Sequence, residues 1–139
     1  MSLNKTSSLV LPLRLLAALL AMGAQPANAD PKEDGFAAYA RGDFAAAQRL
    51  LRPLAEDGNP DAQMAVGFMY HDGQGADRSD LYAYVWFYLA ASNFDPRSQD
   101  FLDAFAARDL TEHAMTSADI KRGNEMAHQC QAQHYKNCY

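Results

Sequence analysis

The C-terminal end of the chain holds the side chains whose types could bind a metal ion. They are His113, His128, Cys130 and His134. Imidazoles and thiolates are ligands that Zn²⁺ prefers, but these residues do not reproduce the spacings of known zinc sites. His128 and His134 also fall on different faces of a helix, and a disulfide is expected to consume the Cys130 thiolate. We therefore expect solvated surface histidines, with no metal and no cofactor.

Sequence motifs for nucleophilic catalysis or phosphate binding are absent. The chain contains no G-x-S-x-G, no H-E-x-x-H and no P-loop, and Gly73-Gln74-Gly75 is too short to cradle a phosphate. The acid pairs Glu33-Asp34 and Glu56-Asp57 lie at expected helix ends, where carboxylates favour capping and solubility. We therefore expect no catalytic residues and no enzymatic activity.

Cys130 and Cys138 both lie in the last ten residues of the chain. An oxidising compartment would join them. On a continuous α-helix, residues eight apart are separated by about 12 Å, whereas a disulfide needs Cα atoms within about 7 Å of each other. We therefore expect the last helix to end between the two cysteines and the disulfide to hold the end of the chain in place.

The first 29 residues have the pattern of a secretory signal peptide. They carry Lys5 and Arg14 but no acid, followed by the apolar run 15–24 and the small-residue ending Ala27-Asn28-Ala29. The apolar run is about half as long as a membrane-spanning helix. We expect cleavage after Ala29 and a periplasmic or secreted protein with no stable membrane insertion.

The residues that remain after removal of this segment are enough for one domain, and their net charge is more negative than that of the whole chain. The whole chain has a net charge of −5, and the segment 1–29 contributes two positive charges, so the remainder carries −7. Such a chain repels the phosphates of nucleic acids and of anionic membranes. Neither is expected as a partner.

Helical periodicity runs through the rest of the sequence, and no segment alternates like a β-strand. The predicted helices are 31–41, 44–57, 60–72, 80–93, 96–109 and 117–133. Their expected N-caps are Asp30, Asp43, Asn59, Ser79 or Asp80, Asp95 and Thr116. Three of these caps precede a proline, the residue favoured at the first position of a helix.

The second and fourth predicted helices repeat one another at an offset of 36 residues. Phe44, Ala47, Leu50, Leu51, Leu54 and Ala55 align with Asp80, Ala83, Trp86, Phe87, Ala90 and Ala91, and all pairs but the first match in character. Repeated helix pairs at this spacing are typical of solenoids. The predicted fold is therefore all-α, a short α/α solenoid of helix-turn-helix repeats with a C-terminal helical cap.

The segment 62–75, which reads AQMAVGFMYHDGQG, resembles a Sel-1-like repeat almost position by position, and Asp80, 83–87 and 90–91 continue the match. Residues 34–58 resemble a shortened first repeat. The resemblance implies two repeats over 30–93 and closing helices over 94–139, as in exported bacterial members. It implies binding of a protein or peptide, as an adaptor or regulator in the cell envelope. Some cysteine-rich relatives are associated with β-lactam recognition, so a periplasmic hydrolase or β-lactam-recognising enzyme is the alternative.

The expected repeat core combines a helical stripe with small residues. It comprises Ala62, Val66, Gly67, Tyr70, Gly73, Gly75, Ala83, Trp86, Ala90 and Ala91. We expect Gly67 to let two helices approach closely, and Gly73 and Gly75 to supply loop conformations that other residues reach only at a cost. Trp86 should fill the space that the alanines leave.

The best candidate for ligand contact is a stripe on the third predicted helix, opposite the buried one. It comprises Met64, Phe68 and His71. The first helix of each pair in such solenoids usually lines the concave surface, which favours this stripe. The alternative is that the stripe packs on the preceding helix.

The fourth predicted helix is apolar or aromatic at every position from 81 to 91. Such a helix must be covered on more than one side. Phe101, Leu102 and Phe105 of the following helix could cover it. Otherwise a partner docks on this aromatic face, or a second copy covers it in a self-associating structural subunit.

Overall fold

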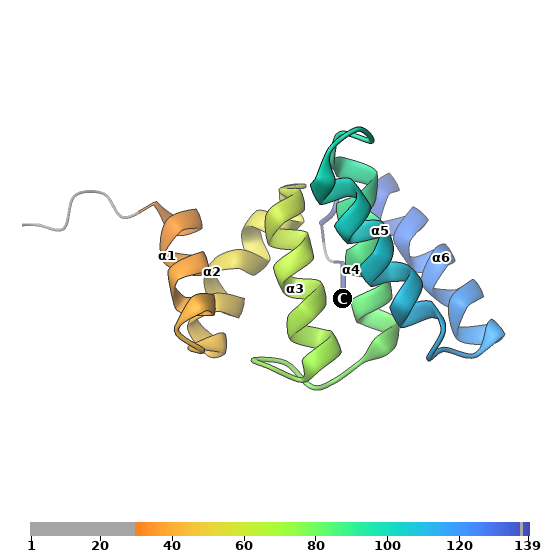
Figure 1. Ribbon diagram of the computed structural model, residues 1–139, viewed down its shortest axis with the longest axis horizontal. Helices are drawn as coiled ribbons and strands as arrows, with labels where there is room; N and C mark the ends of the chain where they lie inside the picture. Colours follow the sequence, from red (N-terminus) through yellow and green to blue (C-terminus); the bar gives the residue numbers. More distant parts are fainter. Residues whose placement is uncertain (1–29, 137) are drawn as a thin grey trace, which may run out of the picture.

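The computed structural model describes residues 30–136, Cys138 and Tyr139, and all regular structure in this part of the chain is helical. The all-α prediction is therefore confirmed. The helices are α1 (Pro31–Ala40), α2 (Phe44–Glu56), α3 (Pro60–Asp72), α4 (Asp80–Asn93), α5 (Gln99–Glu112) and α6 (Ser117–Ala132) (Figure 1). None of these described helices is long and apolar enough to cross a membrane. The signal peptide predicted over 1–29 lies outside the described residues.

Side-chain caps fix the starts of five helices. The caps predicted at Asp30, Asp43, Asn59 and Thr116 are confirmed, and Ser79 is the cap of α4. Each side chain accepts a hydrogen bond from a backbone N–H of the first turn, at distances between 2.9 and 3.2 Å. These bonds satisfy N–H groups that have no partner within the helix, so the polar residues set where each helix begins.

The predicted start of α5 at residue 96 was wrong, because Asp95 closes a turn instead of capping a helix. Its carboxylate accepts from the backbone N–H of Arg97 at 2.9 Å, and its carbonyl accepts from the N–H of Ser98 at 2.8 Å. The Ser98 hydroxyl oxygen instead caps the helix, because it accepts a hydrogen bond from the backbone N–H of Phe101 at 3.1 Å. The helix therefore begins at Gln99 and extends to Glu112, three residues beyond the predicted end.

Successive helices pack on one another from α1 to α4, and α5 and α6 both pack on α4 (Figure 1). α4 is consequently the central helix and is covered by α3, α5 and α6. Its side chains Tyr84, Trp86, Phe87 and Leu89 are buried. Most of residues 81–91 are therefore covered within the chain, while Leu81, Tyr82 and Tyr88 are partly buried. The buried side chains need neither a docked partner nor a second copy to shield them.

Of the three residues predicted to cover α4, only Phe101 packs against the buried cluster of Ala90, Ala91 and Ala104. Leu102 and Phe105 were expected to pack over α4, but they are 54% and 44% exposed. α5 instead buries Ala104 and Thr111 against the rest of the molecule, with Phe101 partly buried. Small residues at this contact allow the two helix backbones to approach closely, which leaves the bulky side chains of α5 on the outside.

The glycines of the repeat lie where a side chain would collide. A Cβ at Gly67 would lie 2.6 Å from two ring carbons of Phe87, so this glycine permits the close contact of α3 with α4. Gly73 and Gly75 have φ values of 68° and 72°, in the left-handed region that favours glycine. A Cβ at Gly75 would also lie 2.5 Å from the carbonyl oxygen of Phe44. The loop after α3 therefore passes directly over the start of α2.

The other residues of the expected repeat core lie inside the molecule. Ala62, Val66, Ala83, Trp86 and Ala90 are fully buried, Ala91 is 7% exposed, and Tyr70 is half-buried against the core.

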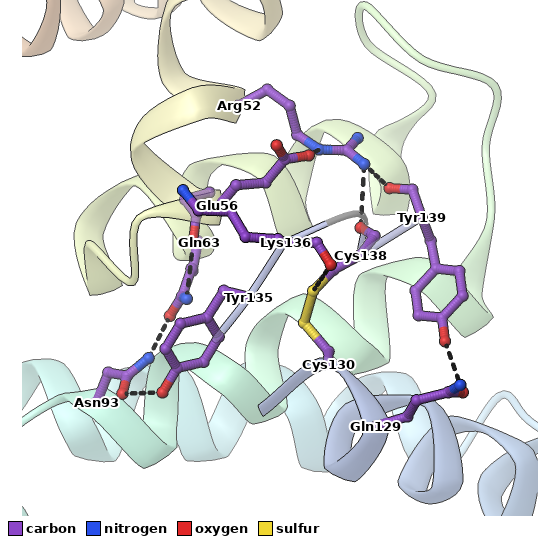
Figure 2. Close-up of a disulfide and its surroundings, with 11 residues drawn as sticks. Arg52, Glu56, Gln63, Asn93, Gln129, Cys130, Tyr135, Lys136, Cys138 and Tyr139 are labelled. Atoms are coloured by element: carbon purple, nitrogen blue, oxygen red, sulfur yellow. Dashed lines mark hydrogen bonds and ion pairs between the residues drawn. A yellow bond between two sulfur atoms is a disulfide. The ribbon is translucent and has the colours of Figure 1, made fainter. Parts of the chain in front are cut away.

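A disulfide joins Cys130 to Cys138, with the Cα atoms 5.4 Å apart (Figure 2). α6 ends at Ala132, between the two cysteines, as the spacing predicted. The segment that follows turns back toward α2 through His134 and Tyr135, whose φ values of 51° and 63° are positive. The disulfide thus holds the end of the chain against the body of the molecule.

A chain of hydrogen bonds joins this C-terminal segment to three helices (Figure 2). The hydroxyl of Tyr135 donates to Asn93 at 2.8 Å, and the Asn93 amide donates to Gln63 at 2.9 Å. The Gln63 amide in turn donates to the carbonyl oxygen of Ala55 at 3.0 Å. Gln63 is fully buried, so these bonds offset the cost of placing a polar side chain in the core.

Candidate functional site

A pocket of about 180 Å³ opens between the first turns of α3 and α5. Met64 of α3 and Phe94, at the C-terminal end of α4, supply its apolar surface, and both pack against the small buried cluster of Ala90, Ala91 and Ala104. Asp61 of α3 and two residues of α5, Asp100 and Asp103, complete the lining. The pocket therefore combines an apolar floor with carboxylates. Met64 is the one residue of this lining that the sequence had predicted to contact a ligand.

The three carboxylates differ in what already pairs with them. Asp61 accepts a hydrogen bond from the Lys32 ammonium at 2.9 Å, and this bond raises the pKa of Lys32 above its usual range. Asp103 accepts from the side-chain amide of Gln99 at 2.8 Å, a neutral partner. Asp100 lies in the first turn of α5, where the helix dipole favours a negative charge. Most of the negative charge at the pocket therefore belongs to α5.

The pocket lies at one end of a longer surface. Helical spacing places Asp103, Ala107 and Leu110 on the same side of α5, as it places Met64, Phe68 and His71 on one side of α3. Leu110 is 68% exposed, the largest value among the exposed large hydrophobic residues. α4 lies between α3 and α5 and packs on both (Figure 1). We call this surface, formed by the two sets of three residues and the pocket, the α3/α5 face.

The three residues predicted to contact a ligand have different surroundings. Met64 lines the pocket. Phe68 is half-buried and packs edge to face on Phe87 of α4, with ring centroids 5.0 Å apart. His71 is also half-buried, with its Nδ1 atom 3.6 Å from a carboxylate oxygen of Asp80. The stripe thus leans toward α4, and not toward the preceding helix, while part of each side chain stays accessible.

Sequence analysis missed Asp61, Phe94, Asp100, Asp103 and Leu110 as members of this surface. The carboxylates of α5 resembled an ordinary solvated helix face, and Phe94 follows the last residue of α4. One signal was present: Asp103, Ala107 and Leu110 recur at helical spacing beside the buried stripe of Ala104 and Thr111. Whether these three side chains lie near α3 depends on how α5 packs on α4, which the spacing does not indicate.

The C-terminal histidines that could have been metal ligands each contact a different neighbour. His113 follows α5, and its Nδ1 atom lies 2.7 Å from the carbonyl oxygen of Asp109, a contact that raises the pKa of the imidazole above its usual range. His128 packs edge to face on Tyr88, with ring centroids 5.6 Å apart. Among the described residues, no group of three or more His, Cys, Asp or Glu side chains is placed to hold a metal ion.

The side chains that line the pocket are of two kinds, apolar groups and carboxylates. Carboxylates beside methionine and phenylalanine can hold a group that is apolar along its length and cationic at its tip.

The chain is similar to a curated protein over part of its length. A stretch of 83 residues is 35% identical to the chitin synthase regulator SKT5 of Saccharomyces cerevisiae, covering 60% of this chain. The chain spans about a tenth of the length of that protein. No family model and no solved structure matches the chain. The similarity is therefore to a protein named as a regulator, which fits a role in protein interaction in general.

Proposed function

We propose that this chain is an exported Sel-1-like repeat protein that binds another protein or a peptide, as an adaptor or regulator in the cell envelope. The repeat motif over 62–75 and its continuation through 91 support the family assignment. The sequence over 1–29 supports export, with cleavage after Ala29. On this proposal residues 30–93 are two repeats, the first one shortened, and 94–139 are the closing helices.

The observation that carries the binding proposal is the pocket between α3 and α5 and the exposed surface that continues from it. Ligand sites are concave and mostly apolar, with a few polar groups that fix orientation. Here Met64 and Phe94 provide the apolar part, and the carboxylates provide the polar part. Leu110, at 68% exposure, provides a large side chain that a partner could bury. The similarity to a regulator supports the same role.

Leu110→Asp tests this proposal. A charge buried in an interface should weaken capture of the partner from envelope extract by at least about tenfold, because it must be desolvated without a counter-charge. Stability should change by less than about 0.5 kcal/mol, since the side chain is exposed. Leu102→Asp is the matched control, because Leu102 is also exposed but does not lie on the α3/α5 face. Equal capture by both variants would reject the proposal.

Export has its own test. The proposal predicts that the protein recovered from the envelope fraction begins at Asp30, and intact-mass measurement checks this directly. A protein that retains residues 1–29 and stays in the cytoplasmic fraction would contradict export, and it would leave the binding proposal to be judged by the Leu110 variant.

A further inference from the structure

The shape and chemistry of the pocket select one kind of side chain. Its floor is made of Met64 and Phe94, which gain from contact with methylene groups. Its lining also includes Asp61, Asp100 and Asp103, whose carboxylates favour a cation. Carboxylates alone would be an ordinary solvated surface. Above an apolar floor they match lysine or arginine, whose apolar stem ends in a charged head.

The charge balance at the pocket leaves room for an added cation. Lys32 pairs with Asp61 at 2.9 Å, whereas no salt bridge within the described part of the chain involves Asp100 or Asp103. Asp103 is met by the neutral amide of Gln99. Two of the carboxylates that line the pocket are therefore without a counter-charge in the described part of the chain, and a single lysine or arginine head group can lie near both.

The surface beyond the pocket indicates what flanks that basic residue. Ala107 and Leu110 of α5 and Phe68 of α3 continue the α3/α5 face, and they are apolar. A segment lying along this face would place apolar residues next to its lysine or arginine. The net charge of −7 after residue 29 attracts a basic segment from a distance and repels an acidic one.

We infer that the α3/α5 face takes a segment of a partner protein in which a lysine or arginine sits beside apolar residues, with the basic side chain in the pocket. This inference rests on the proposed function, because it assigns a chemistry to the partner of the same surface. The expected occupant is a basic segment of another protein. An acidic or neutral segment, or a second copy of this chain, is not expected.

Selection from a phage-displayed library of random linear peptides tests the inference. The bait is the full chain, purified with its disulfide intact. The expected result is enrichment of peptides that carry lysine or arginine next to apolar residues. A selected peptide, made synthetically, should bind about tenfold more weakly to the variant Asp100→Asn/Asp103→Asn, because the loss of each exposed ion pair costs up to about 1 kcal/mol. Its affinity should also fall with added NaCl.

The matched control is Glu33→Gln/Asp34→Asn, which makes the same change in net charge on the exposed first turn of α1. It should alter the affinity by less than about twofold, since those residues do not line the pocket. If both double variants weakened peptide binding equally, the effect would come from the overall charge of the protein and not from the pocket. That result would overturn the inference.

The remaining outcomes separate this inference from the proposed function. The selection could enrich peptides that lack a basic residue and that no longer bind the variant Leu110→Asp. That result would overturn the inference and leave the proposed function standing. Failure to enrich any peptide would count against both. A dimer in solution that Leu110→Asp dissociates would assign the face to a second copy of the chain and overturn the inference.

Discussion

Arg52 of α2 lies over the indole ring of Trp86 in α4, with its guanidinium carbon 5.2 Å from the ring centroid. The same guanidinium donates to Glu56 at 2.8 Å and to the carbonyl oxygen of Cys138 at 3.0 Å (Figure 2). It also donates to the Tyr70 hydroxyl at 3.1 Å. One side chain thus joins α2, α3, α4 and the end of the chain. Because Trp86 is the single tryptophan and is fully buried, its fluorescence reports unfolding directly.

Arg52→Ala should lower the free energy of unfolding by on the order of 2 kcal/mol. It removes a partly desolvated cation–π contact together with hydrogen bonds from a charged donor. Urea denaturation followed by Trp86 fluorescence measures the loss. Arg49→Ala, an exposed arginine of the same helix, is the control and should stay within about 0.5 kcal/mol of the unmodified protein. Indistinguishable midpoints for the two variants would mean that Arg52 does not hold the helices together.

Gly67→Leu should destabilise the protein by about 1 to 3 kcal/mol or more. Even the first added carbon would lie 2.6 Å from the Phe87 ring, so α3 and α4 would have to separate. Ala45→Leu adds the same bulk on an exposed position of α2 and should have little effect. The same urea titration compares the two, and an unchanged midpoint for Gly67→Leu would contradict the close contact of α3 with α4.

Cys130→Ala/Cys138→Ala should cost about 2 to 3 kcal/mol, because the disulfide closes a short loop and restricts the unfolded chain. The variant should also loosen the contact of Tyr139 with Tyr82, whose rings stack with centroids 5.9 Å apart. Adding a reductant to the unmodified protein should reproduce the loss. Mass spectrometry without reduction that found two free thiols would show that the disulfide does not form.

The pKa of His113 should lie above its ordinary value of 6.5 in the folded protein, because the carbonyl oxygen of Asp109 accepts from the protonated imidazole. Because the pKa is raised in the folded state, this contact stabilises the fold fully at pH values below the pKa of the unfolded chain, about 6.5. That stabilisation is lost as the pH rises through the pKa of the folded protein. An NMR titration of the His113 ring measures it. A pKa at or below 6.5 would mean that the contact at the end of α5 is not kept in solution.

Much of the helical framework was predictable because local chemistry decides it. Asp30, Asp43 and Asn59 cap their helices as predicted, since an N-cap acts on backbone groups within its own first turn. The end of α6 between Cys130 and Cys138 followed from geometry alone. These features depend on residues that are close in sequence, so one sequence contains the necessary information.

The errors arose where two local solutions competed. Asp95 and Ser98 are both good N-caps, and Asp95 precedes a proline, yet the helix begins after Ser98. The helix that starts there buries Ala104 and Thr111, with Ala104 in a cluster with Ala90 and Ala91 of α4. That advantage depends on the packing of α5 against another helix, which the sequence around Asp95 does not encode.

The candidate site was predictable only in part for the same reason. Met64 could be found because it lies opposite the buried stripe of its own helix. Asp100 and Asp103 belong to a helix that starts 27 residues after α3 ends, and they reach the pocket only because α3 and α5 both pack on α4. Leu102 and Phe105 were expected inside and lie outside, because alanine and threonine make the closer helix contact.

The most direct measurement of the binding claim is site-specific photo-crosslinking in the producing cell. A photoreactive phenylalanine analogue would replace Leu110, on the α3/α5 face, or Phe105, which is 44% exposed on the other side of α5. We expect a discrete adduct with a second protein from position 110 and little or none from position 105, with tryptic mapping that places the link beside a lysine or arginine of the partner. Equal adducts from both positions, or none from position 110, would contradict the binding claim.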